Sequence, residues 1–117
     1  PIPIAGVARL TVTGSMMGTP QYMAPELALG AELARAPADV FAFGVLAVEL
    51  LTSTHPFASP PVYSALYRKA LPEAEIHAPD GVDPRLIELV RACLDEAPER
   101  RPAITLVLAH LRAVTRR

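Results

Sequence analysis

The stretch DVFAFGVLAVELLT, residues 39–52, lies near the middle of the chain and decides its fold. Ten of the twelve residues from position 40 to position 51 are hydrophobic. A helix of this composition is apolar around most of its circumference and is expected to be buried on all sides. Asp39 stands just before the apolar run, where a carboxylate can cap free backbone N–H groups. The sequence therefore predicts a central core helix over residues 39–52, capped by Asp39.

Shorter helical segments are predicted outward from this helix. Residues 1–25 contain several prolines and glycines and are expected to be extended or irregular. The pair Pro60-Pro61 opens a short helix that runs to about Ala70, and Asp83-Pro84 supplies a cap and a first-turn proline for another. A last helix begins near Pro102. The apolar stripes expected on the last two helices are Leu86, Ile87, Leu89, Val90, Cys93 and Leu94, and then Ile104, Val107, Leu108 and Leu111. No convincing strand pattern occurs, so the predicted fold class is mainly α.

Composition narrows the function classes. The chain has 117 residues, a length that suits one domain. Its net charge is -1, so it has no basic excess for binding nucleic acid or an anionic membrane. The apolar run ends well short of the roughly 20 residues that a membrane span needs. Cys93 is the only cysteine, so no internal disulfide can form, and its place on an apolar stripe predicts a buried structural thiol. We therefore expect a cytoplasmic protein without a transmembrane segment.

Sites of known chemistry are not evident from spacing. His55, His77 and His110 lie far apart in sequence, so a metal site is not expected. Neither G-x-G-x-x-G nor G-x-x-x-x-G-K-[ST] occurs, and no G-x-S-x-G elbow is present. Composition and spacing alone predict a mostly helical cytoplasmic domain.

Three ordered motifs lead further. GTPQYMAPE, residues 18–26, resembles the end of the activation segment of serine/threonine protein kinases, which finishes in Ala-Pro-Glu. DVFAFGV, residues 39–45, resembles the start of that family's buried central helix, and PERRP, residues 98–102, resembles its P-x-x-R-P element. The likeness is closest to bacterial kinases of the eukaryotic type. An unrelated helical bundle would require all three ordered matches to be accidental.

The resemblance implies the helical C-terminal lobe of the two-lobed kinase fold. Residues 1–26 would be the activation segment ending in Ala-Pro-Glu, and residues 27–117 the helical lobe. Glu26 would form a buried ion pair with Arg101, 75 positions later in the chain. Asp39 would support the catalytic loop by hydrogen bonding to its backbone.

The resemblance implies that residues 19–23 contact the substrate. Thr19 resembles the threonine that contacts the catalytic aspartate and helps to select Ser/Thr acceptors. The residues that would shape the substrate-docking loop are Thr19, Pro20, Gln21, Tyr22 and Met23. Their simplest structural alternative is an ordinary turn.

Phosphoryl transfer in this family uses ATP and Mg²⁺, held by a Gly-rich loop, a strand lysine, the H-R-D loop and the D-F-G aspartate. At the positions aligned with D-F-G, Ile4 replaces the aspartate and Ala5 the phenylalanine, and an isoleucine cannot bind a hard cation. The complete kinase is therefore expected to be an enzyme that acts on a protein substrate, whereas this chain alone is expected to bind no cofactor and to need the missing kinase lobe. The alternative is a pseudokinase remnant that serves as a non-catalytic interaction module.

Thr11 and Thr13 match the paired threonines that bacterial relatives carry a few positions before the G-T-P motif, where they are autophosphorylated. A phosphate adds nearly two negative charges and can order a loop against basic side chains. We expect mass spectrometry of the co-expressed, intact kinase to detect phosphate on the peptide spanning residues 10–35. An unmodified peptide from an active preparation would contradict this expectation.

Overall fold

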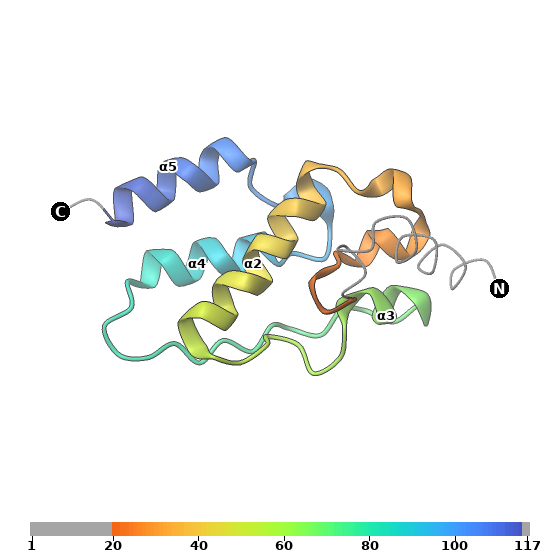
Figure 1. Ribbon diagram of the computed structural model, residues 1–117, viewed down its shortest axis with the longest axis horizontal. Helices are drawn as coiled ribbons and strands as arrows, with labels where there is room; N and C mark the ends of the chain where they lie inside the picture. The colour runs from red at the N-terminus through yellow and green to blue at the C-terminus, as the bar shows by residue number, and fades with distance from the viewer. Residues whose placement is uncertain (1–19, 116–117) are drawn as a thin grey trace.

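The computed structural model describes residues 20–115, which form a small helical assembly (Figure 1). The described part contains helices and turns but no strand. In chain order the elements are the 3-10 helices η2 (Pro20–Tyr22), η3 (Pro25–Leu29) and η4 (Ala31–Leu33), the α-helices α2 (Ala36–Thr52), α3 (Pro61–Leu66) and α4 (Pro84–Cys93), the 3-10 helix η5 (Pro98–Arg100) and the α-helix α5 (Ile104–Thr115). In Figure 1, α2 crosses the centre, with α3 and the 3-10 helices η2 to η4 towards one end and α5 at the other.

The start of α2 differs from the prediction. The helix begins at Ala36, and the N-cap position belongs to Arg35, which makes no side-chain capping bond. Asp39 lies inside the first turn and is exposed. Pro37 explains the earlier start, because a proline in the first turn gives up only an N–H group that has no partner within the helix. Asp39 therefore does not cap the helix, although its charge still lies near the positive end of the helix dipole.

The middle of α2 forms the core, but not on every side. Phe41, Val45 and Val48 are completely buried. Leu46 and Leu50, one turn apart, remain 47% and 77% exposed. The expectation that α2 is buried on all sides is therefore wrong within residues 20–115. The other described helices and turns pack against only part of its circumference.

Gly44 sets the distance between α2 and α4. A Cβ atom at this position would lie 2.9 Å from Cδ2 of Leu94 and 3.0 Å from Cβ of Cys93. The two helices can approach this closely only because position 44 has no side chain. Around this crossing lies a second, smaller cluster of buried residues: Val40, Leu89, Cys93 and Val107.

The helix α3 ends at Leu66, four residues before the predicted end. Arg68 adopts a left-handed conformation with φ of 57°. The amide of Lys69 bonds to the carbonyl of Ser64 at 2.8 Å, and that of Arg68 to Ala65 at 3.1 Å. This pair of bonds is the Schellman arrangement that terminates helices. Arg68 stands where glycine is usual at such a turn, and the sequence therefore does not predict that α3 ends here.

The prediction for α4 is confirmed, and that for α5 only in part. The amide of Arg85 donates to Oδ1 of Asp83 at 2.8 Å, so Asp83 caps α4 as expected. Hydrogen bonds from the Arg85 side chain and amide hold the pKa of Asp83 below its usual value. Within the predicted stripe of α5, Val107 is buried while Ile104 is 46% and Leu108 45% exposed, because α5 lies at the edge of the assembly (Figure 1). None of the helices in residues 20–115 is long and apolar enough to cross a membrane.

Cys93 is fully buried, as predicted, and burial raises the pKa of its thiol from 9.0 to about 11. The folded state thus favours the neutral thiol, and this contribution to stability is complete below pH 9 and is lost as the pH rises through 11. We expect the free energy of unfolding, measured by urea denaturation, to fall more steeply from pH 9 to 11 in the wild type than in Cys93→Ala. Equal slopes would contradict a buried, neutral thiol.

Candidate functional site

A buried ion pair joins the first described segment to the last third of the chain. Glu26, in η3, and Arg101, just after η5, are the two residues that the sequence predicts as a pair. Nη1 of Arg101 lies 2.7 Å from Oε2 of Glu26, and Nη2 lies 2.8 Å from Oε1. The arginine side chain is completely buried and the glutamate side chain 10% exposed. The contact is bidentate, the geometry in which arginine binds a carboxylate most strongly.

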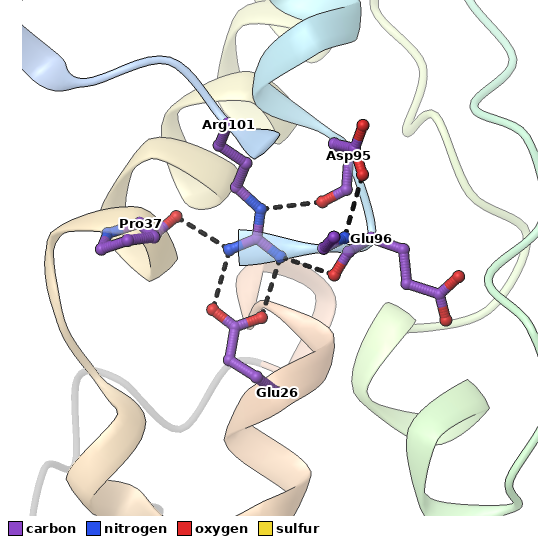
Figure 2. A network of polar contacts seen from close by, with 6 residues as sticks. Glu26, Pro37, Asp95, Glu96 and Arg101 are labelled. Carbon is purple, nitrogen blue, oxygen red and sulfur yellow. Dashed lines mark hydrogen bonds and ion pairs between the residues drawn. The ribbon is translucent and has the colours of Figure 1, made fainter. Parts of the chain in front are cut away.

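Backbone carbonyls complete the surroundings of Arg101 (Figure 2). Nε donates to the carbonyl of Asp95 at 2.8 Å, Nη1 to that of Pro37 at 2.9 Å, and Nη2 to that of Glu96 at 3.2 Å. Together with the two bonds to Glu26, these use all five N–H donors of the guanidinium group. A buried charge with every donor satisfied avoids most of the penalty of an unpaired ion.

Aromatic packing continues from the ion pair into the core. The guanidinium carbon of Arg101 lies 4.9 Å from the ring centroid of Phe41, in α2. Phe41 stacks in turn on Phe57, with centroids 6.0 Å apart and planes inclined by 9°. The ion pair and the turn after α2 are thus connected through two buried rings.

The predicted substrate-docking loop is a compact turn, η2, followed by a buried anchor. The amide of Met23 donates to the carbonyl of Pro20 at 3.1 Å. Gln21 is exposed, Tyr22 is half-buried, and Met23 is buried in the core. The side chain of Met23 therefore anchors the loop in the core and is not available at the surface.

Tyr22 is tied to the central helix. Its hydroxyl donates a hydrogen bond to the carboxylate of Glu49, in α2. This hydrogen bond, with burial and the negative charge of Glu49, raises the pKa of Tyr22 above its usual value. The phenol therefore stays neutral and continues to donate to Glu49 throughout the physiological pH range.

His55 contacts the backbone of the same loop. Its Nε2 lies 2.8 Å from the carbonyl oxygen of Gln21, across 34 positions of sequence. Its Nδ1 lies 3.1 Å from the amide nitrogen of Phe57. The sequence predicts no role in the docking loop for His55 or Glu49. Glu49 did carry a signal, as the one charged residue in an apolar run, whereas the contact of His55 depends on how the chain folds back.

Three predicted site residues, Thr11, Thr13 and Thr19, lie outside the described part of the chain, as do Ile4 and Ala5 at the positions aligned with D-F-G. Asp39 is described, and it is exposed in the first turn of α2. Within residues 20–115, no group of three or more His, Cys, Asp and Glu residues could hold a metal ion. The residues that the structure brings together at the predicted docking loop are Gln21, Tyr22, Glu49 and His55.

Comparison with known proteins identifies the family of the chain. The family model described as the protein kinase domain matches residues 5–111. The chain is 34% identical over 115 residues to the serine/threonine-protein kinase PkaA of Streptomyces coelicolor, covering 93% of this chain and 21% of that protein. It is 35% identical over 94 residues to the serine/threonine-protein kinase PknA of Mycobacterium tuberculosis, covering 80% of this chain and 21% of that protein. With the serine/threonine-protein kinase gad8 of Schizosaccharomyces pombe it shares 35% identity over 95 residues, covering 81% of this chain and 16% of that protein.

The chain belongs to the protein kinase family. Its mainly helical fold, without strands in the described residues, is that of the C-terminal lobe of the kinase domain. The chain spans about a fifth or less of the length of these relatives.

The buried pair makes a direct prediction about stability. Replacing Arg101 by Gln leaves the Glu26 carboxylate uncompensated, so the free energy of unfolding should fall by about 3 to 5 kcal/mol. The neighbouring Arg100 is exposed, and Arg100→Gln is the matched control, with an expected change within about 0.5 kcal/mol. Arg101→Lys should fall between the two, because an ammonium group keeps the charge but cannot bind in bidentate fashion.

Urea denaturation followed by circular dichroism measures all three variants. Equal effects of Arg100→Gln and Arg101→Gln would show that the ion pair does not hold the lobe together.

Proposed function

We propose that this chain is the activation segment and C-terminal lobe of a serine/threonine protein kinase, and that residues 19–23 receive the acceptor segment of a protein substrate. The observation that carries this proposal is the construction of the loop at η2. Tyr22 is bound to Glu49, the carbonyl of Gln21 is bound by His55, and Met23 is buried below. A turn fixed by several such contacts presents a rigid surface to a ligand, which is how functional loops are held on a scaffold.

The Glu26 and Arg101 pair supports this surface. Glu26 lies three residues after the docking loop, and its two oxygens are held by Arg101. The arginine is itself bound to the carbonyl of Pro37, in α2, and to those of Asp95 and Glu96, between α4 and η5. The role of the pair is structural, since both groups are buried and satisfied. It fixes the exit of the activation segment relative to the central helix.

Phosphoryl transfer itself needs groups that we assign to the rest of the kinase. ATP and Mg²⁺ require a strand lysine, carboxylates and an asparagine, and the sequence holds isoleucine and alanine where the D-F-G aspartate and phenylalanine would stand. Ile4 does not suit a hard cation. We therefore assign no step through the metal to this chain, and we propose that the 117 residues alone are inactive.

The partners that follow are a protein substrate and the remaining part of the kinase domain. Leu46 and Leu50 form an exposed apolar pair on α2, and Asp39 is an exposed carboxylate at the start of the same helix. We propose that the region of the catalytic loop packs on this helix and that Asp39 bonds to its backbone, with Thr19 directed at the catalytic aspartate. We propose a cytoplasmic setting and no nucleic-acid partner, given the balanced charge.

A second candidate is a non-catalytic interaction module of pseudokinase type. Ile4 and Ala5 at the D-F-G positions favour it, and so does a groove of about 350 Å³ beside α3. The groove is lined by Pro56, Phe57, Ala58, Ser59, Ser64, Pro72, Glu73 and Glu75. Such a surface persists when the chemistry of a kinase is lost.

Transfer of radiolabelled phosphate from ATP to casein separates these candidates. We expect no transfer by the 117-residue chain and transfer by a form extended upstream through the Gly-rich loop and the H-R-D motif. Silence of both forms would favour the interaction module. Activity of the 117-residue chain by itself would overturn the assignment of the chemistry to the rest of the kinase.

A further inference from the structure

His55 occupies the turn between α2 and α3, close to the docking loop. Its Nε2 lies 2.8 Å from the carbonyl oxygen of Gln21. The ring also meets Tyr22 edge-on, with centroids 6.1 Å apart and planes inclined by 62°. One side chain therefore touches two consecutive residues of a loop that is 34 positions away in sequence.

The partners of the ring determine where its protons lie. A carbonyl oxygen only accepts hydrogen bonds, so Nε2 must carry a proton to bond to Gln21. In the neutral ring, Nδ1 is then an acceptor, and the amide of Phe57 lies 3.1 Å away to donate to it. In the charged ring, Nδ1 can donate to the carbonyl of Phe57, which is 3.0 Å away. The bond to Gln21 survives in both states, and only the neutral tautomer with a proton on Nδ1 would break it.

The ring is held in place by a rigid turn. Pro56 and Phe57, which follow His55, are buried. Phe57 stacks on Phe41 of α2, and its ring meets that of His55 edge-on at 6.2 Å. The half-buried ring of His55 is therefore ordered by its packing on a buried neighbour, and this cost has been met before the loop binds anything.

We propose that His55 is a positioning residue that fixes the backbone of the docking loop through the hydrogen bond from Nε2 to the carbonyl of Gln21. The contact with Glu49 holds the loop by the Tyr22 side chain, whereas His55 holds it by its main chain, one residue earlier. Two attachments on neighbouring residues fix the orientation of the turn as well as its position. The proposal rests on the proposed function, because it is the substrate that would meet this turn.

Two variants separate the hydrogen bond from the packing. His55→Phe keeps a ring against Tyr22 and Phe57 but removes both ring nitrogens, the Nε2 donor to Gln21 and the Nδ1 partner of the Phe57 amide. His55→Gln restores a terminal N–H donor without the ring. His77 is exposed in the loop before α4, so His77→Phe is the matched control for the substitution itself.

The first measurement needs no substrate. The amide of Met23 closes the turn of the docking loop by bonding to Pro20, and its hydrogen exchange reports local opening. Loss of the hydrogen bond to Gln21 should speed this exchange by about 2- to 10-fold in His55→Phe, with recovery toward wild-type exchange in His55→Gln, whose amide can donate to Gln21 again, and no change in His77→Phe. An exchange rate in His55→Phe equal to that of the wild type would overturn the proposal.

Nitrogen NMR of the wild-type imidazole provides a test that holds even if a variant fails to fold. The spectrum should show that the proton of the neutral ring is on Nε2. A ring with its only proton on Nδ1 would overturn the proposal.

The second measurement uses the extended kinase described above, with casein as substrate. Loss of a group that only shapes the binding surface should raise KM by about 2- to 10-fold in His55→Phe and leave kcat unchanged. A fall in kcat at constant KM would overturn the positioning role. If the extended wild type shows no activity, the proposed function fails, while exchange and NMR still decide whether His55 fixes the loop.

Discussion

The guanidinium group of Arg101 is the contact on which the rest of the lobe depends. Its five donors reach one carboxylate and three backbone carbonyls, which belong to segments 75, 64, 6 and 5 positions away. A charge buried this deeply is tolerated only when all its donors are bonded, so each of these segments is restricted to one arrangement. The start of α2, the η3 helix and the turn before α5 meet at this point, as Figure 2 shows.

The ion pair and the docking loop are parts of one packed unit. From Arg101, contacts pass through Phe41 and Phe57 to the ring of His55, and from there to the backbone of Gln21. Phe41, Phe57 and His55 are rings, and such side chains have few rotatable bonds to order. His55 therefore holds the loop at η2 itself, and Glu26 holds the chain three residues after the loop. This arrangement is suited to a surface that must keep its shape while a partner binds and leaves.

The departures from the sequence-based expectations share a physical cause, namely that the decisive interactions are tertiary. Pro37 allowed α2 to begin three residues before Asp39, and Arg68 ended α3 in a left-handed turn without a glycine. The apolar run of α2 predicts complete burial of the helix, yet Leu46 and Leu50 are exposed. Hydrophobic composition does not determine which faces of a helix other elements pack against. Gly44, unremarkable in sequence, determines how closely α2 and α4 pack.

The sequence by itself determined the family, the helical class, the capping of α4 by Asp83 and the burial of Cys93, because these follow from local patterns and literal motifs. It also pointed to Glu26 and Arg101 as partners, through the resemblance of their motifs. Tertiary structure alone decided that the docking loop is attached through Glu49 and His55. Hydrogen bonds between segments 27 and 34 positions apart leave no periodic or compositional mark, since each requires only one suitable atom at each end and a fold that brings the two together.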